Sequence, residues 1–414
     1  MNMKTEPGSA AEQAGPRTRM LVIATLGFAV TFWAWALISP LAPSLATKLG
    51  LSSFQQSLIV AVPVIVGSLG RIPIGALTDR FGGRLMLPIV SVATIVPVLF
   101  LAFFGDQSLA AVLIGGFFLG IGGTSFAVGV PFVSAWFPPE RRGLAIGIFG
   151  VGMVGTAISA FTTVRLVEFG SSATPFLVTA AALAIYAVVA WLLLRDAPGQ
   201  VRPTTSMAKR VGETLKLGVT WQAAALYATL FGGYVAFSVY LPSLLKAEYD
   251  LSIADASNRM AGFVILAVIM RPVGGFLSDK IGPVPVLATC LGAVVFGALI
   301  DATSPALFPI ATIAYLVMAA GLGAGSGATF ALVALLSPAG KVGSVTGVVG
   351  AAGGLGGFVP PLLMGVVYGA TGSYTIGFLL LALVAAAVLV FTLTSIRSVL
   401  AKRDAVEVQR EVAA

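Results

Sequence analysis

The sequence predicts an all-α membrane protein whose twelve transmembrane helices form two pseudo-symmetric six-helix bundles. Three observations lead to this prediction. The 414 residues are 58% hydrophobic and only 10% charged, the chain divides into twelve long apolar stretches, and a motif in the first half recurs 200 residues later. A membrane-spanning helix needs about 20 apolar residues, so twelve helices with their loops account for the whole length.

The composition excludes several other classes of protein. A soluble domain carries about 25% charged residues, and the mean hydropathy of +1.01 is incompatible with a disordered chain. Cys290 is the only cysteine and there is no histidine, so neither a disulfide framework nor a metal site is expected. We expect no cofactor and no nucleic-acid partner, because the net charge of +8 is explained by basic residues in cytoplasmic loops.

The expected spans follow the apolar stretches in chain order. Each begins and ends where charged residues interrupt the hydrophobic run. Two of them, 109–136 and 306–336, are longer than the bilayer requires and are expected to tilt or to extend past it. The twelve expected spans are 20–44, 56–77, 86–104, 109–136, 143–164, 173–194, 219–244, 258–277, 284–300, 306–336, 342–369 and 374–396.

Lysine and arginine indicate the orientation, because basic residues concentrate in cytoplasmic loops. If both termini are cytoplasmic, 18 of the 24 basic residues lie in cytoplasmic segments and four lie in external segments. The remaining two are Arg71 and Arg271, which fall within spans 2 and 8. We therefore expect a multi-pass protein of the cytoplasmic (inner) membrane with both termini inside.

The longest internal polar stretch separates the two halves. Residues 195–218 contain two prolines and five basic residues, and they are interpreted as a cytoplasmic linker. The expected organisation is a cytoplasmic tail, a first six-helix half, the linker, a second six-helix half and a cytoplasmic C-terminal tail, at residues 1–19, 20–195, 196–218, 219–397 and 398–414.

A sequence repeat relates the two halves. The motif at the end of span 2 recurs at the end of span 8 with a constant offset of 200 residues, so that Arg71, Gly75, Asp79, Arg80 and Gly82 match Arg271, Gly275, Asp279, Lys280 and Gly282. Three glycines of span 5 recur in span 11 at the same offset: Gly143, Gly147 and Gly150 match Gly343, Gly347 and Gly350. Duplicated halves of parallel orientation are typical of secondary transporters.

The segment from Gly75 to Arg84 resembles the signature between helices 2 and 3 of the major facilitator superfamily. With twelve spans and a central basic loop, the resemblance covers the whole chain and implies the fold of that superfamily. It also implies that this loop helps to latch the two halves on the cytoplasmic side. The alternative is a solvated turn that only sets the topology. The candidate latch residues are Asp79, Arg80, Arg84 and Asp279.

Arg71 and Arg271 are the strongest candidates for a functional role. A charge at the centre of a span costs at least about 2.5–3.5 kcal/mol, and all 16 acidic residues fall in loops, tails or helix ends. Because the repeat relates the two arginines, we expect them to face each other between the halves. A planar oxyanion would complete this site, since arginine presents a planar fork of donors and stays charged. Alternatively, each arginine snorkels or bonds helix carbonyls and only tunes packing.

Glycine is the second notable feature. Glycine every three or four residues makes a smooth helix face, along which backbones can approach closely and slide. Static close packing is the simpler interpretation. The glycines concerned are Gly147, Gly150, Gly152 and Gly155 in span 5, and Gly347, Gly350, Gly353 and Gly354 in span 11. The glycine-rich segment 321–327 lacks a following Lys-Ser/Thr pair, so it is not a nucleotide site.

The glycine segments also resemble those of the nitrate/nitrite porter family within the superfamily. The stretches 122–127, 137–138, 227–233 and 350–358 carry this resemblance. It implies that Arg71 and Arg271 hold the oxygens of nitrate or nitrite, that Tyr227 donates a hydrogen bond, and that Phe126 and Phe231 sandwich the planar ion. The alternative for each aromatic residue is a place in the helix core or against lipid.

Met153 departs from the pattern of that family. Many members have asparagine at this place in the span-5 signature, so the substitution removes a polar contact and leaves open which anion is carried. Methionine is nevertheless compatible with a wall that is complementary in shape to the anion.

The energetics of anion uptake leave two modes of coupling open. An interior-negative membrane opposes entry of an anion by about 2.3 kcal/mol per 100 mV. Exchange of one anion for another avoids this cost, as does carrying more than one proton per anion. The absence of histidine and of acidic residues in mid-span favours exchange of nitrate for nitrite. The intact loop with Asp79, however, resembles the branch of the family assigned to proton-coupled nitrate uptake.

Other functions are also compatible with the sequence. A carrier for another small anion, such as a carboxylate or cyanate, would keep the same fold. A receptor that binds the anion without moving it would need a signalling domain, for which no polar segment is long enough. An enzyme is not expected, because catalytic groups are missing. We expect the protein to act as a monomer.

Overall fold

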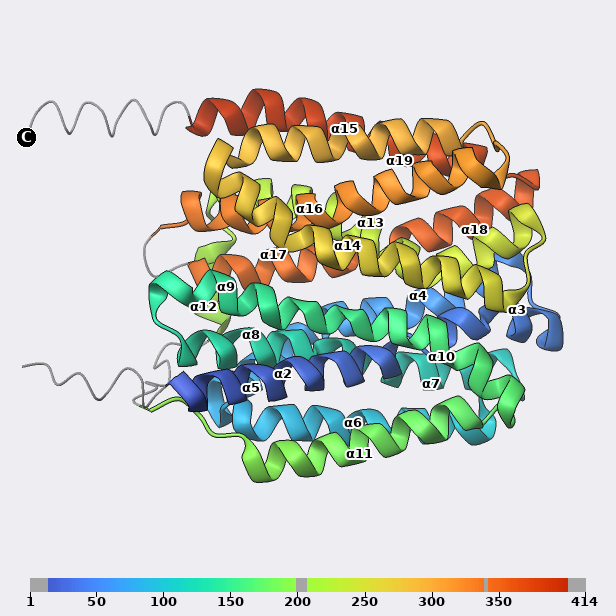
Figure 1. Ribbon diagram of the computed structural model, residues 1–414, viewed down its shortest axis with the longest axis horizontal. Helices are drawn as coiled ribbons and strands as arrows, with labels where there is room; N and C mark the ends of the chain where they lie inside the picture. The colour runs from blue at the N-terminus through green and yellow to red at the C-terminus, as the bar shows by residue number, and fades with distance from the viewer. Residues whose placement is uncertain (1–13, 199–206, 339–341, 401–414) are drawn as a thin grey trace, which may run out of the picture.

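The computed structural model describes residues 14–198, 207–338 and 342–400. Its helices lie side by side along the long axis of the molecule (Figure 1), and the described residues contain no β-strand. Twelve helical segments are long and apolar enough to span a membrane. The predicted fold class is therefore confirmed.

The first half contains six spans, most of which are divided into shorter helices. The short segments η1 and η2 are 3-10 helices, which are wound more tightly than the α-helices that flank them. In chain order the elements are α2 (Ala14–Trp35) with α3 (Ile38–Leu49), α4 (Ser53–Leu69) with α5 (Arg71–Phe81), α6 (Gly83–Phe104), α7 (Leu109–Leu119) with η1 (Gly120–Thr124) and α8 (Ser125–Trp136), α9 (Pro139–Gly150) with η2 (Val151–Val154) and α10 (Gly155–Phe169), and α11 (Thr174–Leu193).

The second half is built from longer helices. Its two short segments, η3 and η4, are π-helical turns at the ends of spans, and no 3-10 segment occurs in the described residues of this half. The elements are α13 (Gly218–Tyr249), α14 (Ile253–Ile281), α15 (Pro283–Asp301), η3 (Leu307–Ala311) with α16 (Thr312–Leu336), α17 (Val342–Gly356) with α18 (Val359–Thr371), and α19 (Thr375–Phe391) with η4 (Thr392–Ile396).

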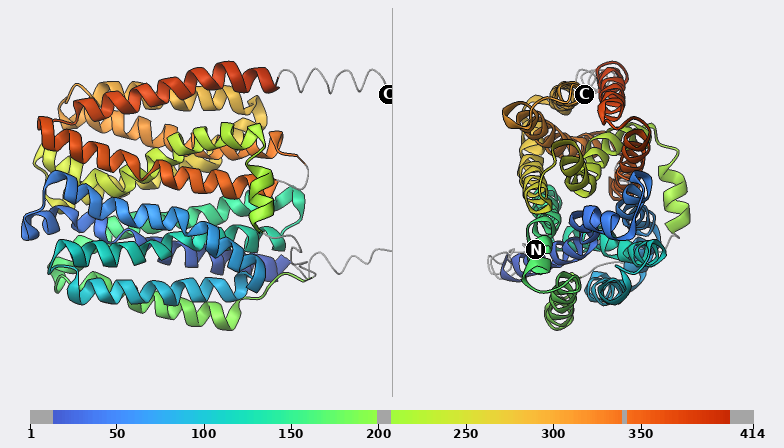
Figure 2. Two further views of the ribbon diagram at one scale, coloured as in Figure 1. Left: turned by 180° about the vertical axis from the view of Figure 1, so that it is seen from behind. Right: turned by 90° about the vertical axis from the view of Figure 1, so that its right-hand side faces the viewer.

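The predicted linker between the halves contains a helix of its own, α12 (Met207–Thr214). This helix lies crosswise at one end of the bundle (Figure 2) and packs against α17. The rest of the linker in 199–206, and most of the predicted tails in 1–13 and 401–414, lie outside the described residues. We call the end of the bundle that carries α12 the linker end, and the opposite end the far end.

Several spans are longer than predicted. Helix α13 continues past residue 244 to Tyr249 and includes Lys246, and α14 begins at Ile253 rather than at 258. The predicted bounds stopped at charged residues. Backbone hydrogen bonding continues beyond the apolar stretch until a capping residue interrupts it.

Equivalent residues determine where helices begin and end in the two halves. Ser52 and Ser252 are N-caps whose hydroxyl oxygens accept hydrogen bonds from the backbone three residues later. Gly82 and Gly282 end spans 2 and 8 with φ values of 87° and 85°, in a region that favours glycine because it has no Cβ. The repeat is therefore present in the backbone as well as in the sequence.

The two halves pack against each other through a few helix pairs. Helix α4 lies against α17 and α18, α10 against α14, and α3 against α13, and Figure 2 shows the two bundles side by side. Large apolar side chains cover the outside of the molecule. Val96 is 69% exposed and Leu383 is 65% exposed, as expected for surfaces that face lipid rather than water.

Candidate functional site

Arg71 lies at a break in span 2. Helix α4 ends at Leu69 and α5 begins at Arg71, and Pro73 favours this break because its ring lacks an N–H and excludes the carbonyl four residues earlier. The side chain is half-buried and reaches the other half. Nη1 of Arg71 donates to the carbonyl oxygen of Gly350 at 2.9 Å, and its Nε donates to that of Gly123 at 3.3 Å.

Arg271 occupies the equivalent position in α14 and also reaches into the opposite half. Its Nη2 donates to the hydroxyl of Tyr227 at 2.7 Å, and its Nη1 donates to Sδ of Met153 at 2.9 Å. Each arginine thus has one partner in its own half and one in the other. The first-half partners of both arginines, Gly123 and Met153, belong to the 3-10 segments η1 and η2.

Each guanidinium group lies beside an aromatic ring. The guanidinium carbon of Arg71 lies 5.4 Å from the ring centroid of Phe126, and that of Arg271 lies 5.5 Å from the centroid of Phe231. Tyr227 and Phe231 are buried and stack with 4.6 Å between their centroids. All five residues predicted to bind substrate therefore lie together where the two halves meet.

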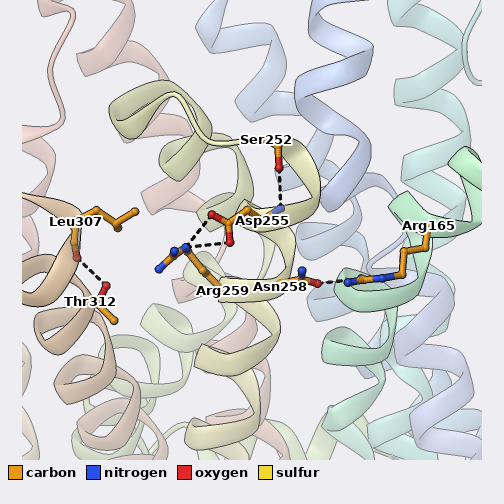
Figure 3. Close-up of polar contacts among 7 residues, drawn as sticks. All are labelled: Arg165, Ser252, Asp255, Asn258, Arg259, Leu307 and Thr312. Atoms are coloured by element: carbon orange, nitrogen blue, oxygen red, sulfur yellow. Dashed lines mark hydrogen bonds and ion pairs between the residues drawn. The ribbon is translucent and has the colours of Figure 1, made fainter.

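Neither arginine pairs with a carboxylate among the residues that the structure describes. Their hydrogen-bond partners are carbonyl, hydroxyl and thioether groups, and Arg71 and Arg271 are close enough to repel each other. The ion pairs of Lys48 with Asp106 and of Asp255 with Arg259 lie at the far end, away from the two arginines, and Figure 3 shows the second of them. Two positive charges with only neutral acceptors make a site that favours an anion.

Half of the predicted glycine positions are closely packed. A Cβ at Gly353 would collide with the ring of Tyr227, and one at Gly354 would collide with the side chain of Ser68 in the other half. Glycine is therefore needed here for the helices to approach. The glycines packed in this way are Gly152, Gly155, Gly353 and Gly354.

Toward the linker end the same helix faces are open. Gly147, Gly150 and Gly347 have no described atom within 4 Å of the place that a Cβ would occupy. Gly150 precedes Met153 by one turn of the 3-10 segment, so both point to the same side. Because Met153 contacts Arg271, the open space beside Gly150 faces the other half.

Toward the far end the two halves are in contact. Oγ of Ser39 donates to the carbonyl oxygen of Val239 at 2.6 Å, and Nη1 of Arg165 donates to Oδ1 of Asn258 at 2.9 Å (Figure 3). Helices α4 and α18 approach so closely that a Cβ at Gly365 would meet a serine of α4. The halves are therefore in contact at the far end, whereas open space lies beside Gly147, Gly150 and Gly347 toward the linker end.

The predicted latch lies in the turns that follow spans 2 and 8. The guanidinium carbon of Arg80 lies 5.2 Å from the neighbouring ring of Phe81, and the backbone N–H of Arg84 donates to Asp196 at 3.0 Å. These two contacts are within the first half. The role of Asp79, Arg80, Arg84 and Asp279 as a latch stays a prediction.

Sequence reasoning missed part of the site. Phe330 of α16 lies 5.7 Å from the guanidinium carbon of Arg271 and packs edge-on against Tyr227, yet it is one of 26 phenylalanines and no motif surrounds it. The carbonyl groups of Gly123 and Gly350 were also missed, because a backbone acceptor carries no signal in the residue type. Met153 was singled out only because it departs from a family pattern, and its contact with Arg271 was not predicted.

Comparison with known proteins gives consistent matches over the whole chain. The model of the Major Facilitator Superfamily matches residues 24–258 and 223–411. The probable nitrate/nitrite transporter NarK2 of Mycobacterium tuberculosis is 48% identical over 381 residues, which cover 91% of this chain and 96% of that protein. The nitrite extrusion protein of Bacillus subtilis is 36% identical over 370 residues, which cover 89% of this chain and 91% of that protein.

Solved structures with the same arrangement of helices are more distant in sequence. A D-xylose–proton symporter superposes with a TM-score of 0.72 at 16% identity, covering 91% of this chain and 97% of its own. A bacterial homologue of the human lysosomal transporter Spinster gives a TM-score of 0.70 at 19% identity, covering 92% of this chain and 97% of its own. At such identities the likeness shows the fold alone.

Proposed function

The chain belongs to the major facilitator superfamily, among its nitrate and nitrite transporters, and on this premise we propose that it carries nitrate and nitrite across the membrane by alternating access. The observation that carries the proposal is the pair Arg71 and Arg271. They come from opposite halves, lie within membrane spans, and bond only neutral acceptors in the described structure.

The geometry of the donors suits a small planar oxyanion. A guanidinium group presents parallel N–H donors in one plane, which match two oxygens of such an ion. Tyr227 adds a third donor, because its hydroxyl oxygen accepts from Arg271 and its own proton is free to turn toward the anion. Phe126 and Phe231 would then cover the two faces of the ion.

The same charges link binding to the conformational change. Closing the linker end around an empty site would bring two positive charges together in a region of low dielectric. A bound anion removes this repulsion, so that closure follows binding. A carrier of this kind moves loaded far more readily than empty, which supports exchange of one anion for another. Proton-coupled uptake requires a proton site in addition.

The orientation proposed here follows from the basic residues. The linker end carries most of them, and it would face the cytoplasm, whereas the far end would face outward. The conformation would then be open to the cytoplasm. The two halves of one chain supply both arginines, so that a monomer suffices for the complete site.

Counterflow in proteoliposomes tests the proposal. Vesicles loaded with unlabelled nitrite and containing the purified protein should take up labelled nitrate against its gradient, and uptake should stop when internal nitrite is omitted if exchange is the mode of coupling. Uptake driven by an imposed pH gradient without internal anion would identify proton coupling instead. Formate, acetate and cyanate serve as competitors. If one of them displaced nitrate completely at a concentration lower than that of nitrate, the transported anion would be that competitor. Failure of every anion to support counterflow would contradict transport.

A further inference from the structure

Asp301 is a buried carboxyl group that takes no part in the site described above. It is the last residue of α15, at the far end of the second half. Asp301 is only 3% exposed. Neither of its carboxyl oxygens accepts a hydrogen bond from a described residue. Other residues of the protein bury Asp301, without any contribution from lipid.

The surroundings disfavour a negative charge at this position. A carboxylate removed from water without a donor or a cation is strongly unfavourable, so the neutral acid is favoured instead. Asp301 also lies at the C-terminal end of a helix, where the unsatisfied carbonyl groups form the negative end of the helix dipole. Both effects act in the same direction and favour the protonated form.

The groups around Asp301 do not supply a counter-charge. Tyr249 of α13 and Tyr315 of α16 lie close enough to interact with it electrostatically, and Glu248 lies near the same two tyrosines. Tyr374 stands at the start of α19, which also packs against α15. These neighbours are neutral or acidic.

The basic residues at this end of the second half do not reach Asp301. In α14, Arg259 bonds Asp255, with 3.2 Å between Nε and Oδ1, and the pair is visible in Figure 3. Lys246 of α13 forms no ion pair with Asp301 in the described part of the chain. The described segment η3, which follows Asp301 at this end, contains no charged residue.

The first half shows how an acidic residue is stabilised at the same end. Asp106 follows α6, the counterpart of α15, and its Oδ2 lies 2.5 Å from Nζ of Lys48. This ammonium group holds the pKa of the Asp106 carboxyl below its ordinary value. At the offset of 200 residues, the counterpart of Lys48 is Glu248.

The register at that position is secured by the backbone. Gly50 and Asp250, two residues after Lys48 and Glu248, both have left-handed φ values, of 62° and 51°. The repeat therefore places an acidic residue where the first half has its cation. The second half retains an acidic residue at the far end without the lysine that would keep it ionised.

From this arrangement we propose that Asp301 is a proton-binding site, occupied while the far end is closed and emptied when that end opens to water. On opening, the O–H bond of the carboxylic acid breaks, the proton passes to external water, and a hydrated carboxylate remains. On closing, the carboxylate takes a proton from external water. Acidic external solution should therefore favour the conformation that is closed at the far end.

This inference rests on the proposed transport cycle and adds to it the proton site that the sequence did not reveal. The proton enters from external water and returns to it, so the inference does not require that the proton be carried through to the cytoplasm.

Infrared difference spectroscopy on the purified full-length protein tests the protonation directly. The wild type at neutral pH should show the C=O stretch of a protonated carboxyl group that Asp301→Asn lacks. Asp106→Asn is the matched control, because it removes an acidic residue from the same end that is already ionised, and it should keep the band. Absence of a protonated-carboxyl band from the wild type, or its persistence in Asp301→Asn, would overturn the proposal.

Counterflow at varied external pH tests the link to the transport cycle. The rate for the wild type should change several-fold between mildly acidic and mildly alkaline external solution. Asp301→Asn should still exchange anions but with a flat pH profile, and Asp301→Glu should restore the dependence. An unchanged profile in Asp301→Asn refutes the link. Loss of counterflow from the wild type itself would instead contradict the proposed function, so the two failures are distinguishable.

Discussion

Arg271 donates a hydrogen bond to the sulfur of Met153 at 2.9 Å, across the contact between the two halves. A thioether is a weak acceptor, so this donor is only loosely engaged and stays available to an anion. The symmetry-related Arg71 instead donates to a backbone carbonyl, that of Gly350, which is a stronger acceptor. The two arginines are thus equivalent in position but differ in how readily they release their partners.

This difference makes Met153→Asn informative. An asparagine amide can accept from Arg271 and donate to a bound anion, and one added hydrogen bond contributes about 0.5–1.5 kcal/mol. We expect KM for nitrate to fall, by roughly twofold to tenfold. Met153→Leu keeps the volume without an acceptor and should transport at a rate close to that of the wild type. A higher KM in the asparagine variant, measured by counterflow, would show that the sulfur serves as more than a weak acceptor.

Replacing either arginine by lysine should abolish transport. Lysine keeps the positive charge but lacks the planar fork, so the paired hydrogen bonds to the oxyanion are lost. Hydrogen bonds to a charged group contribute about 1.5–3 kcal/mol each, so loss of one pair should reduce kcat/KM by at least about a hundredfold. Expression and insertion should persist in Arg71→Lys and Arg271→Lys, as checked by size-exclusion chromatography. Transport like that of the wild type would contradict the assigned role of the arginines.

Tyr227→Phe removes the hydroxyl group that accepts from Arg271. The variant keeps the ring stacked on Phe231 and loses one donor to the anion, so KM should rise about tenfold while the thermal midpoint changes little. Tyr234→Phe is the matched control. Its hydroxyl faces Thr156 at 3.3 Å rather than an arginine, and its removal should leave KM unchanged. Equal effects of the two variants would indicate packing rather than anion binding.

The open glycines predict a separation of binding from turnover. Gly347→Ala adds a methyl group where the described structure has open space, so this conformation should be tolerated and anion binding retained. When the linker end closes, the same methyl group would stand between the halves and slow turnover. We expect kcat to fall severalfold with little change in affinity measured by calorimetry. An unchanged kcat would mean that this helix face does not close against the other half.

How much the sequence revealed depends on the kind of interaction. Arg71, Arg271 and Tyr227 could be assigned to one site because an intramembrane charge, a constant offset and a family pattern are all visible in residue types. The carbonyl of Gly350 could not, since its role depends on how one half is rotated against the other. Each of the twelve predicted spans overlaps one long apolar helical segment, but the ends of the helices were not predicted, because capping residues rather than charges terminate them.

Asp301 shows a different limit. All acidic residues were expected in loops, tails or helix ends, and Asp301 is the last residue of α15. Its burial depends on α13 and α16, whose packing around α15 cannot be read from local sequence. One clue was present in the sequence nevertheless. Glu248 stands at the repeat position equivalent to Lys48, so the second half lacks the lysine that would serve as counter-ion for an acidic residue at this end.

The 3-10 segments η1 and η2 give the first half a capacity for length change, and the described residues of the second half contain no 3-10 segment. Residues in a 3-10 helix rise about 2.0 Å each and those in an α-helix about 1.5 Å, so rewinding the four residues of η2 would shorten span 5 by about 2 Å. Rewinding η1 would shorten span 4 similarly. Arg71 and Arg271 each hold one of these segments, through Gly123 and Met153. An anion that accepts hydrogen bonds from both arginines in place of Gly123 and Met153 would free both segments at once. Binding of a small ion would then allow spans 4 and 5 to shorten along their axes.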